Sequence, residues 1–455
     1  MNILSLDSQI DNSIFKCCAV FFNRFHMSRI LRRCGLVKKF GALVNMVFLF
    51  VLGQAFEGKK LSTLNNHYDS KVPFGKDVVY RFLDRPDVNW EKIVLFTAEA
   101  VIPEIRKLTS DKRKVALVFD DTTQYRNRSK KVEMLARCYD HAENRYYKGH
   151  TLLTMGWTDG QTFIPVDYRV VSASNDKNLI EGSHIADDNR TIATKRHKDA
   201  RRGKPALVLD MLRDAKGSEV CAHYVMFDSW YSSPASLLPI LGMGYDVVAR
   251  LKNNTTRYLY NGEMLTLREI YGKNRKRRGM SKYLLSVNAE VVHREYGGAP
   301  AKIVFVRNRH RRGEWIALIS TDMSLNEEEI IALYGKRWDI EVFFKVCKSV
   351  LKLGKEYQCR SFDAISALVA IVFIRYMKLA VDNRENRDAR SLGELFISCC
   401  KELEDISFSY AFDLILETFS RFMRDFVGLP KSAVEAATEH FVVALPSFIK
   451  ARLAV

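Results

Sequence analysis

The chain has 455 residues, of which 47% are hydrophobic and 27% are charged, a globular composition that excludes a disordered chain. Its length allows a large core and two or three domains. The 71 Lys and Arg residues exceed the 53 Asp and Glu residues, which gives a formal net charge of +18. This surplus favours a polyanionic partner such as nucleic acid, and a merely basic protein is the alternative.

The cysteines and apolar segments indicate a cytoplasmic protein. The nine cysteines lack Cys-x-x-Cys or paired Cys/His spacing, which argues against a disulfide framework or a zinc site and fits a reducing cytosol. The most apolar run, residues 41–56, contains Asn45 and Gln54 and is short for a membrane span, so it predicts a buried helix. Asp7 and Asp11 interrupt the N-terminus, which has no signal-peptide layout, so we expect no targeting segment.

Residues 1–108 have the pattern of a helical region. Apolar residues recur at helical spacing in four segments: 15–25, 41–56, 78–83 and 87–105. Basic residues follow the first of them, at Arg24, Arg29, Arg32, Arg33, Lys38 and Lys39. Small helices with basic residues fit a DNA-binding module, and a plain helical cap is an equal alternative, because no helix-turn-helix pattern is clean here.

From residue 112 the pattern changes to short strands. Residues 115–119 form an apolar run that predicts a buried strand stopping at Asp120 and Asp121. Residues 152–157 and 162–171 predict two further strands joined by a turn at Asp159-Gly160. We therefore expect a three-stranded meander.

Alternating strands and helices follow. Residues 190–204 hold seven Lys or Arg residues and one acid, and we expect a mobile basic stretch there. Residues 224–227 predict a strand that ends at Asp228. The neighbouring segments predict helices at 206–215 and 234–241 and a strand at 246–251.

Residues 252–320 are rich in β-prone residues and turns. The sequence Tyr260-Asn261-Gly262 predicts a tight turn, and strands are expected at 302–307 and 315–320. Two basic loops, 273–282 and 307–312, lie in this region. Beyond it we expect a long apolar helix at 364–381 and helices in the remainder, to residue 455.

Between these segments, Tyr334, Arg337, Glu341 and Lys348 stand at steps of three, four and seven residues, which one helix would place on one side. The pattern Ser324-Leu325-Asn326-Glu327 is typical of a capping box at a helix start. A solvated face of ordinary ion pairs is the alternative for these charges. The other positions are apolar and predict a helix packed on several sides: Trp338, Ile340, Val342, Phe343, Val346 and Val350.

Three carboxylates then suggest a metal site. Asp120 and Asp228 each follow a short apolar strand, where sites assemble in α/β sheets, and Glu341 lies on the later helix. Together they could hold two divalent ions for phosphoryl transfer, and Mg²⁺ suits such oxygen ligands. Arg337 and Lys348 could contact phosphates of the substrate. For each Asp alone, a helix cap or a turn residue is the alternative.

The pattern Tyr334-x2-Arg337-x3-Glu341-x6-Lys348 resembles the Y-R-E-K signature of bacterial insertion-sequence DDE transposases, an IS-four-like family. Residues 120–122 and 227–229 also resemble the first and second acidic motifs of that family, and the resemblance covers roughly residues 110–385. It implies an α/β fold with an RNase H-like mixed sheet flanked by helices, a mostly β insertion, and helical N- and C-terminal regions.

Carried over residue by residue, the resemblance implies a catalytic, metal-binding triad of Asp120, Asp228 and Glu341, with two Mg²⁺ ions that Mn²⁺ can replace. Asp121 is the alternative for the first position, because Thr122 and Thr123 let both aspartates fit an Asp-x-Thr pattern. Tyr334, Arg337 and Lys348 would contact DNA. Lys345 and Trp230 are further candidate DNA contacts; Trp230 would stack on an unpaired base, and core packing is its alternative.

The resemblance implies cut-and-paste transposition: cleavage at terminal inverted repeats, then strand transfer into target DNA by a homodimer, with no membrane partner and a location at the bacterial nucleoid. The basic loops would follow the DNA backbone. The alternatives are an RNase H-like nuclease without strand transfer and a non-catalytic DNA-binding derivative. The expected domains are a DNA-binding region at 1–108, a catalytic core at 109–251 and 321–385, a β-rich insertion at 252–320, and a C-terminal region at 386–455.

Overall fold

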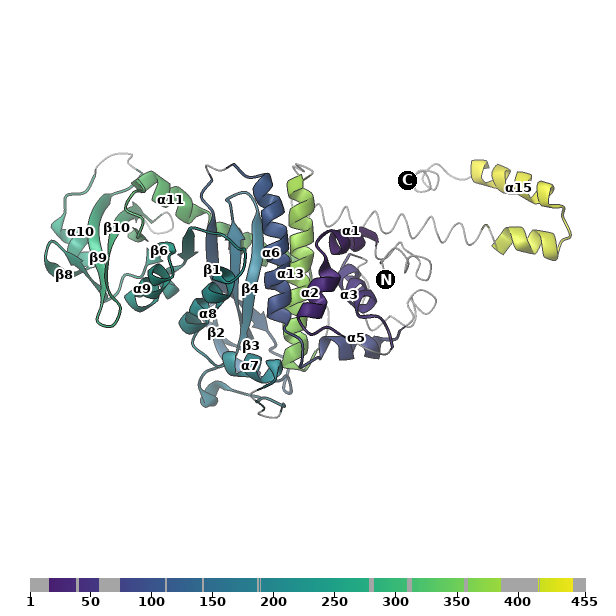
Figure 1. The fold of residues 1–455 in the computed structure, drawn as a ribbon, viewed down its shortest axis with the longest axis horizontal. Coiled ribbons are helices and arrows are strands. Elements are labelled where there is room, and N and C mark those ends of the chain that lie inside the picture. Colours follow the sequence, from purple (N-terminus) through teal and green to yellow (C-terminus); the bar gives the residue numbers. More distant parts are fainter. Residues whose placement is uncertain are drawn as a thin grey trace.

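The computed structural model is built around one mixed sheet (Figure 1). It describes these residues: 16–37, 41–56, 74–110, 113–140, 143–185, 188, 190–277, 282–308, 313–355, 359–385, 416 and 418–444. The sheet has eleven strands in the order β2-β3-β1-β5-β6-β11-β10-β9-β7-β8, and β4 pairs with β3 away from this path. The fold class expected from the sequence is confirmed: an α/β fold, RNase H-like, with helices flanking the sheet.

The first part of the sheet joins an antiparallel meander to two parallel strands. Its strands are β1 (Ala116–Tyr125), β2 (Ala136–Asp140), β3 (Arg145–Thr158), β4 (Phe163–Val171), β5 (Tyr224–Phe227) and β6 (Asp246–Leu251). Strand β3 pairs antiparallel with β1 and β4, as the predicted meander requires, whereas β5 runs parallel to both β1 and β6. The sequence patterns did not reveal β2.

Strand β1 corrects one expectation. The strand does not stop at the acidic pair but continues through Asp120 and Asp121 to Tyr125. The reason is its antiparallel partner: the pairing with β3 extends from Ala116–Thr158 to Tyr125–Gly149. Only the parallel pairing with β5 ends beside the acids, at Phe119 and Phe227. Backbone hydrogen bonds to β3 therefore carry the strand past its apolar run.

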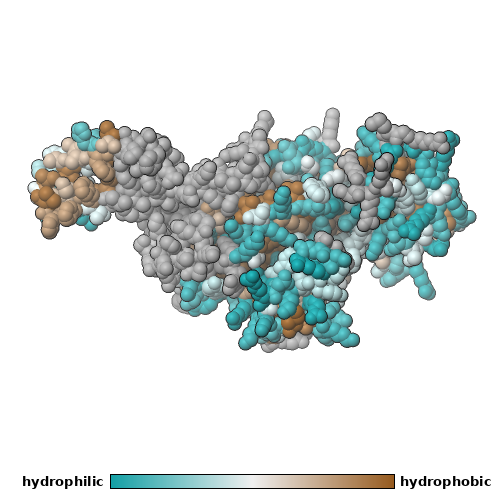
Figure 2. Space-filling model, turned by 180° about the vertical axis from the view of Figure 1, so that it is seen from behind, coloured by the Kyte–Doolittle hydropathy of each residue, from teal (hydrophilic) through white to brown (hydrophobic). Residues whose placement is uncertain are grey.

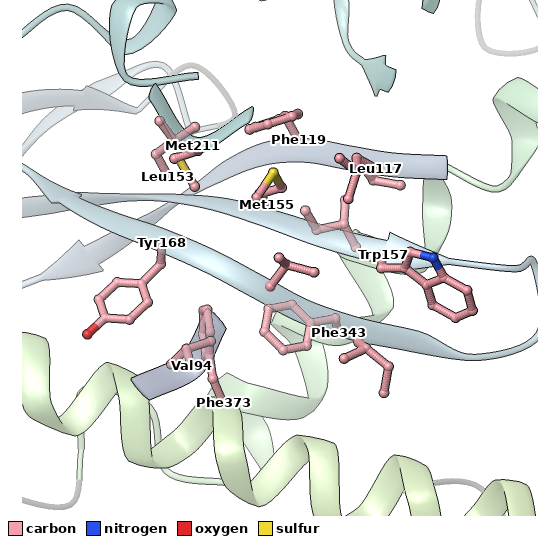
Figure 3. Close-up of a cluster of buried hydrophobic side chains, with 14 of the residues drawn as sticks. Val94, Leu117, Phe119, Leu153, Met155, Trp157, Tyr168, Met211, Phe343 and Phe373 are labelled. Atoms are coloured by element: carbon pink, nitrogen blue, oxygen red, sulfur yellow. The ribbon is translucent and has the colours of Figure 1, made fainter. Parts of the chain in front are cut away.

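Helices cover both faces of this meander (Figure 1). Helices α6 (Trp90–Lys107) and α13 (Phe362–Glu385) lie side by side and pack on β4. Figure 3 shows Val94 of α6 and Phe373 of α13 on one side of the sheet and Met211 of α8 (Lys204–Lys216) on the other. In this core Leu117 and Phe119 point toward α8, so the even-numbered residues of β1 face the opposite way, because side chains alternate along a strand.

The N-terminal helices pack against α6 and α13 on the side that faces away from the sheet (Figure 1). They are α1 (Lys16–Arg24), α2 (Met27–Arg33), α3 (Val44–Gln54) and α5 (Lys76–Leu83), and they confirm the helical pattern of the described residues in this region. Arg375 of α13 is fully buried and donates hydrogen bonds to the carbonyl oxygens of Leu52, at 2.9 Å, and of Val51. It thereby satisfies carbonyls at the end of α3, which have no partner within their own helix.

Helix α13 has the length and apolar composition of a membrane span, but its apolar window is completely buried within the protein. The helix packs on α6, β4, α5 and α3. A core helix passes the same test of length and composition, and this contact pattern is that of a core helix.

The basic stretch 190–204 is a second correction. Residues 192–199 form helix α7 (Ile192–Asp199), and Arg196 within it is buried between Glu91 and Asp363. A high density of Lys and Arg is typical of a solvated loop, but two carboxylates distant in sequence neutralise Arg196 inside the protein. The predicted helices at 206–215 and 234–241 are confirmed as α8 and α9 (Pro234–Gly242).

The β-rich part extends the same sheet. It contains β7 (Arg257–Tyr260), β8 (Glu263–Thr266), α10 (Leu267–Lys273), β9 (Leu285–His293), β10 (Gly297–Arg307) and β11 (Trp315–Ser320). Strand β11 pairs antiparallel with β6, so the insertion continues the sheet at its edge. The predicted turn is confirmed: Asn261 and Gly262 join β7 to β8 with φ angles of +52° and +84°, the pair of positive values that a type I′ hairpin turn requires. Residues 278–281 and 309–312, which belong to the two basic loops, lie outside the described residues.

Near the C-terminus the structure describes residue 416 and residues 418–444, which include α15 (Lys431–Ala444). Hydrophobic colour gathers on this segment in Figure 2. Its exposed apolar side chains are Phe419, Phe422, Phe426, Val427, Phe441 and Val443. The helical expectation holds for the described part, and the rest of 386–455 lies outside the described residues.

A buried histidine makes the stability of this core dependent on pH. His150 of β3 is fully buried, and burial lowers its pKa to about 4. Between pH 4 and 6.5 the unfolded chain therefore binds a proton that the folded chain does not, so stability rises with pH and reaches its full value above pH 6.5. We expect His150→Gln to remove about 2 kcal/mol of the difference in unfolding free energy between pH 5 and 7.5.

The measurement for this prediction is urea unfolding at both pH values. The exposed His223 supplies the control. His223→Gln should leave the pH difference as it is, and an unchanged difference in His150→Gln would assign the pH dependence to other groups.

Candidate functional site

The pairing of β1 with β5 brings two aspartates together. Phe119 and Phe227 form the last parallel pair, and the residue after each is Asp120 or Asp228. Beyond this point β1 continues with β3 alone, and β5 gives way to the 3₁₀ helix η4 (Ser229–Tyr231). One Asp228 oxygen accepts a hydrogen bond of 2.6 Å from the Ser229 backbone N–H, so the ordinary capping role is present as well.

Asp120 and Asp121 point to opposite faces of the sheet. Asp121 turns toward the α8 side, where it pairs with the Lys204 Nζ at 2.9 Å and accepts a hydrogen bond of 2.8 Å from the Tyr231 hydroxyl. Asp120 turns toward the other side, where its Oδ2 lies 3.1 Å from Nη1 of Arg337. The two residues that the sequence left as alternatives are therefore in different surroundings.

The segment that carries the Tyr-Arg-Glu-Lys pattern forms two helices, which corrects the expectation of one. Helix α11 (Glu327–Gly335) ends before Lys336, and α12 (Trp338–Ser349) begins after Arg337. Lys336 holds the turn between them: its Nζ donates to the backbone oxygens of Lys114, at 2.9 Å, and Asp159, at 3.3 Å. The spacing of the residues alone could not reveal this break.

Two further expectations for this segment need correction. The capping box belongs to Asn326 and Glu329, each of which bonds the backbone N–H of the other, and not to Ser324 and Glu327. Helix α12 is also not packed on all sides. Ile340 and Phe343 are fully buried, but Trp338 is 61% exposed and Val342 is 43% exposed.

Arg337 joins two of the three candidate carboxylates. Its Nη1 binds Asp120 and its Nη2 binds Oε1 of Glu341, so the guanidinium lies between them. The Arg337 side chain is only 15% exposed, and the Nε atom is buried without a hydrogen-bond partner in the described structure. The break between α11 and α12 allows this contact, because it places Arg337 at the N-terminus of α12 above β1.

The electrostatics follow from burial and from these neighbours. Burial raises the pKa of Asp120 to about 7, against the opposing effect of Arg337, and the negative charges of Asp121 and Asp228 add to the rise. Burial also raises the pKa of Tyr334 to about 12, and Asp228 contributes to that increase. Asp228 therefore acts on both Asp120 and Tyr334, which places the predicted residues in one electrostatic neighbourhood.

Lys348 and Lys345, both on α12, differ. Lys348 turns inward and donates to the Thr122 hydroxyl at 2.6 Å, and burial lowers its pKa. Lys345 is exposed to solvent.

Trp230 is 54% exposed, which rules out the core-packing alternative. The Nζ atoms of Lys204 and Lys252 each lie 5.6 Å from the centroid of its ring.

The residues present suit a hard cation in their chemistry. Asp120, Asp228 and Glu341 offer only oxygen donors, the kind that Mg²⁺ prefers. Within the described residues no three acidic, His or Cys side chains stand close enough to form a ready metal site. The guanidinium between Asp120 and Glu341 gives the physical reason: a cation already holds the place between two of the donors.

The protein is thus an α/β protein with an RNase H-like sheet and acidic residues where the central parallel pairing of β1 with β5 ends. The chain belongs to the DDE superfamily endonuclease family, whose model matches residues 55–311, more than half of the chain. No curated protein matches it. A DDE superfamily endonuclease acts on DNA, and enzymes of this superfamily generally use divalent metal ions.

The matched span includes Asp120, Asp121 and Asp228 and ends before Tyr334 and Glu341. The family match therefore does not test the assignment to the branch with the Tyr-Arg-Glu-Lys signature, which rests on residues of α11, α12 and the turn between them. Reasoning from the sequence missed Tyr231, which lies against Asp121, and the basic segment 126–131, which follows β1. The run of Arg and Lys at 126–131 was a signal that could have revealed this segment.

Proposed function

We propose that the protein is a DDE transposase of the Y-R-E-K branch, which cleaves DNA at terminal inverted repeats and transfers the strand to target DNA. The observation that supports this most is that Asp120 and Asp228 follow the last parallel pair of β1 and β5, while Arg337 of the α11–α12 turn bonds both Asp120 and Glu341. The family match supports the chemistry, and the net charge of +18 supports a DNA substrate.

In this proposal Asp120, Asp228 and Glu341 hold two Mg²⁺ ions, and Mn²⁺ can replace them. When bound, the ions would activate the attacking water or 3′ hydroxyl and stabilise the leaving oxygen. Arg337 would exchange its carboxylate partners for a substrate phosphate, which it can contact with two parallel hydrogen bonds. Tyr334 and Lys348 would position the DNA end.

The exposed groups near this centre complete the proposal. Trp230, with Lys204 and Lys252 beside its ring, would stack on an unpaired base, because every base has a π-face. Lys345 and the basic loops at 273–282 and 307–312 would follow the backbone. Two ends must meet in one complex, so we propose a homodimer within the cell, at the nucleoid.

The proposed division into domains follows the same logic. Residues 109–251 and 321–385 would form the catalytic core, and residues 252–320 would be an insertion between the second aspartate and the glutamate. Residues 1–108 would bind DNA, and 386–455 would form a separate C-terminal region. The strands β7 to β11 and the N-terminal helices support these boundaries.

Glu341→Gln tests the proposal. The substitution keeps the size of the side chain and removes its charge, so we expect Mg²⁺-dependent cleavage of the DNA that flanks the coding region to fall on the order of 10³-fold. Glu328→Gln is the matched control, because Glu328 is an exposed carboxylate of α11 that pairs with Lys282. Cleavage by Glu341→Gln at the wild-type rate would remove Glu341 from the mechanism.

The same assay separates transposition from simple hydrolysis. Labelled ends joined to a target plasmid support strand transfer. Cleavage without joined products would favour a structure-specific nuclease. Metal-independent binding without cleavage would favour a non-catalytic derivative.

A further inference from the structure

A basic groove lies beyond the far end of β1. Its volume is about 790 Å³, and its described lining runs from Tyr125 to Val132 and includes Cys359 and Arg360. Five cations stand in this lining: Arg126, Arg128, Lys130, Lys131 and Arg360. No acidic residue belongs to the described lining, so the groove has a strong positive charge at close range.

Arg126 is the cation whose surroundings are least complete. Its Nη1 donates to the backbone oxygen of Gly354 at 2.8 Å, but its Nε is buried without a hydrogen-bond partner in the described structure. Burial lowers the pKa of Arg126, and among the described residues no carboxylate opposes that effect. A partly buried guanidinium without a counter-ion is costly, so an anionic ligand would stabilise it.

Helix α12 and the loop after it connect this groove to the candidate active site. Along β1 the contacts come in order: Arg337 binds Asp120, Lys348 binds Thr122, and the Gly354 oxygen accepts from Arg126. The two segments therefore run side by side, in the same direction, from the carboxylates to the groove. Asp120 and Tyr125 are five residue steps apart along the strand, a distance of about 17 Å.

We propose that this groove binds the phosphate backbone of a DNA duplex that extends from the active site. A distance of about 17 Å corresponds to about five base pairs of B-DNA. The position relative to the cleaved bond rests on the proposed function, but the groove itself does not. Contacts of this kind carry no sequence information and fix the register of the duplex on the protein.

The test variant is Arg128→Gln/Lys130→Gln/Lys131→Gln, which removes three exposed cations and leaves Arg126 in place. The control, Arg213→Gln/Lys216→Gln/Arg268→Gln, removes three exposed cations from α8 and α10. Binding of the full chain to a duplex of arbitrary sequence is measured in EDTA at several salt concentrations. Equal thermal melting of both variants and the wild type verifies that the fold is kept.

The slope of log K against log salt is negative, and each lost phosphate contact makes it shallower. We expect it to become shallower by about 2.7 in the groove variant and by less than about one in the control. Affinity at 0.1 M salt should fall at least about 10-fold in the groove variant only. Equal slopes in the two variants would overturn the proposal. A loss of polyglutamate binding as large as that of DNA would overturn DNA as the ligand.

The metal-free condition separates this inference from the proposed chemistry. Glu341→Gln should keep the wild-type salt slope, because Glu341 does not line the groove. Suppose that Glu341→Gln still cleaves DNA while the salt slope of the groove variant becomes shallower. The proposed mechanism then fails, and the proposal that the groove binds DNA is supported. If Glu341→Gln loses cleavage while the groove variant keeps the wild-type salt slope, the DNA-binding role of the groove is contradicted and the proposed mechanism is supported.

Discussion

Asp120→Asn is expected to reduce metal-dependent DNA cleavage on the order of 10³-fold or more, whereas Asp121→Asn should keep it within about 10-fold of wild type. Asp120 faces Arg337, and through it Glu341, on the α12 side of the sheet. Asp121 faces Lys204 and the Tyr231 hydroxyl on the other side. Of the two aspartates, only Asp120 therefore lies on the face of β1 from which it could share a metal ion with Glu341.

The measurement is the rate of Mg²⁺-dependent cleavage of a plasmid that carries the flanking DNA. The two substitutions make a matched pair, because both remove one carboxylate charge from adjacent residues of β1. Asp121→Asn leaves Lys204 without its carboxylate, so thermal melting must be followed in parallel and activity compared below the lower transition. The opposite order of activities would assign the first catalytic carboxylate to Asp121.

Arg196→Met is expected to lower the free energy of unfolding by about 3–5 kcal/mol. Arg196 is 5% exposed, and its Nε lies 2.7 Å from Oε1 of Glu91 while its Nη1 binds Asp363. Its Nη2 also donates to the Val88 oxygen at 2.6 Å. Removing the guanidinium leaves two buried carboxylates without a partner, which costs much more than the loss of a surface pair.

Urea unfolding measures this change. Arg202→Met is the control, because Arg202 is 40% exposed and pairs with Asp199 and Asp210 at the surface, so its loss should cost less than about 1 kcal/mol. We also expect folded Arg196→Met to bind DNA with the wild-type salt slope. A shallower slope would return Arg196 to the set of phosphate contacts.

The strands and helices were largely predictable because each depends on a local pattern. The apolar runs at 115–119 and 224–227 predicted β1 and β5, and the residues Asn261-Gly262 predicted the tight turn that joins β7 to β8. The end of β1 was not predictable, because its last residues are held by hydrogen bonds to β3 and not by their own hydrophobicity.

The site shows the same division. Spacing correctly grouped Arg337 and Lys348 with Glu341, since both cations reach β1 on the side of Asp120. It could not show that Arg337 starts a second helix, because the break depends on Lys336 bonding to oxygens from two distant segments. Nor could charge density alone separate the buried Arg196 from the exposed cations of the groove.

The sequence by itself determined the kind of fold, the acidic residues after two apolar strands and the basic surplus, because composition and periodicity act over a few neighbouring residues. The tertiary structure decided which aspartate faces α12, which cations are neutralised and where uncompensated positive charge remains. These outcomes depend on the register of β1 against β5 and on contacts between residues more than a hundred positions apart. Such pairings form only when the strands assemble into the sheet.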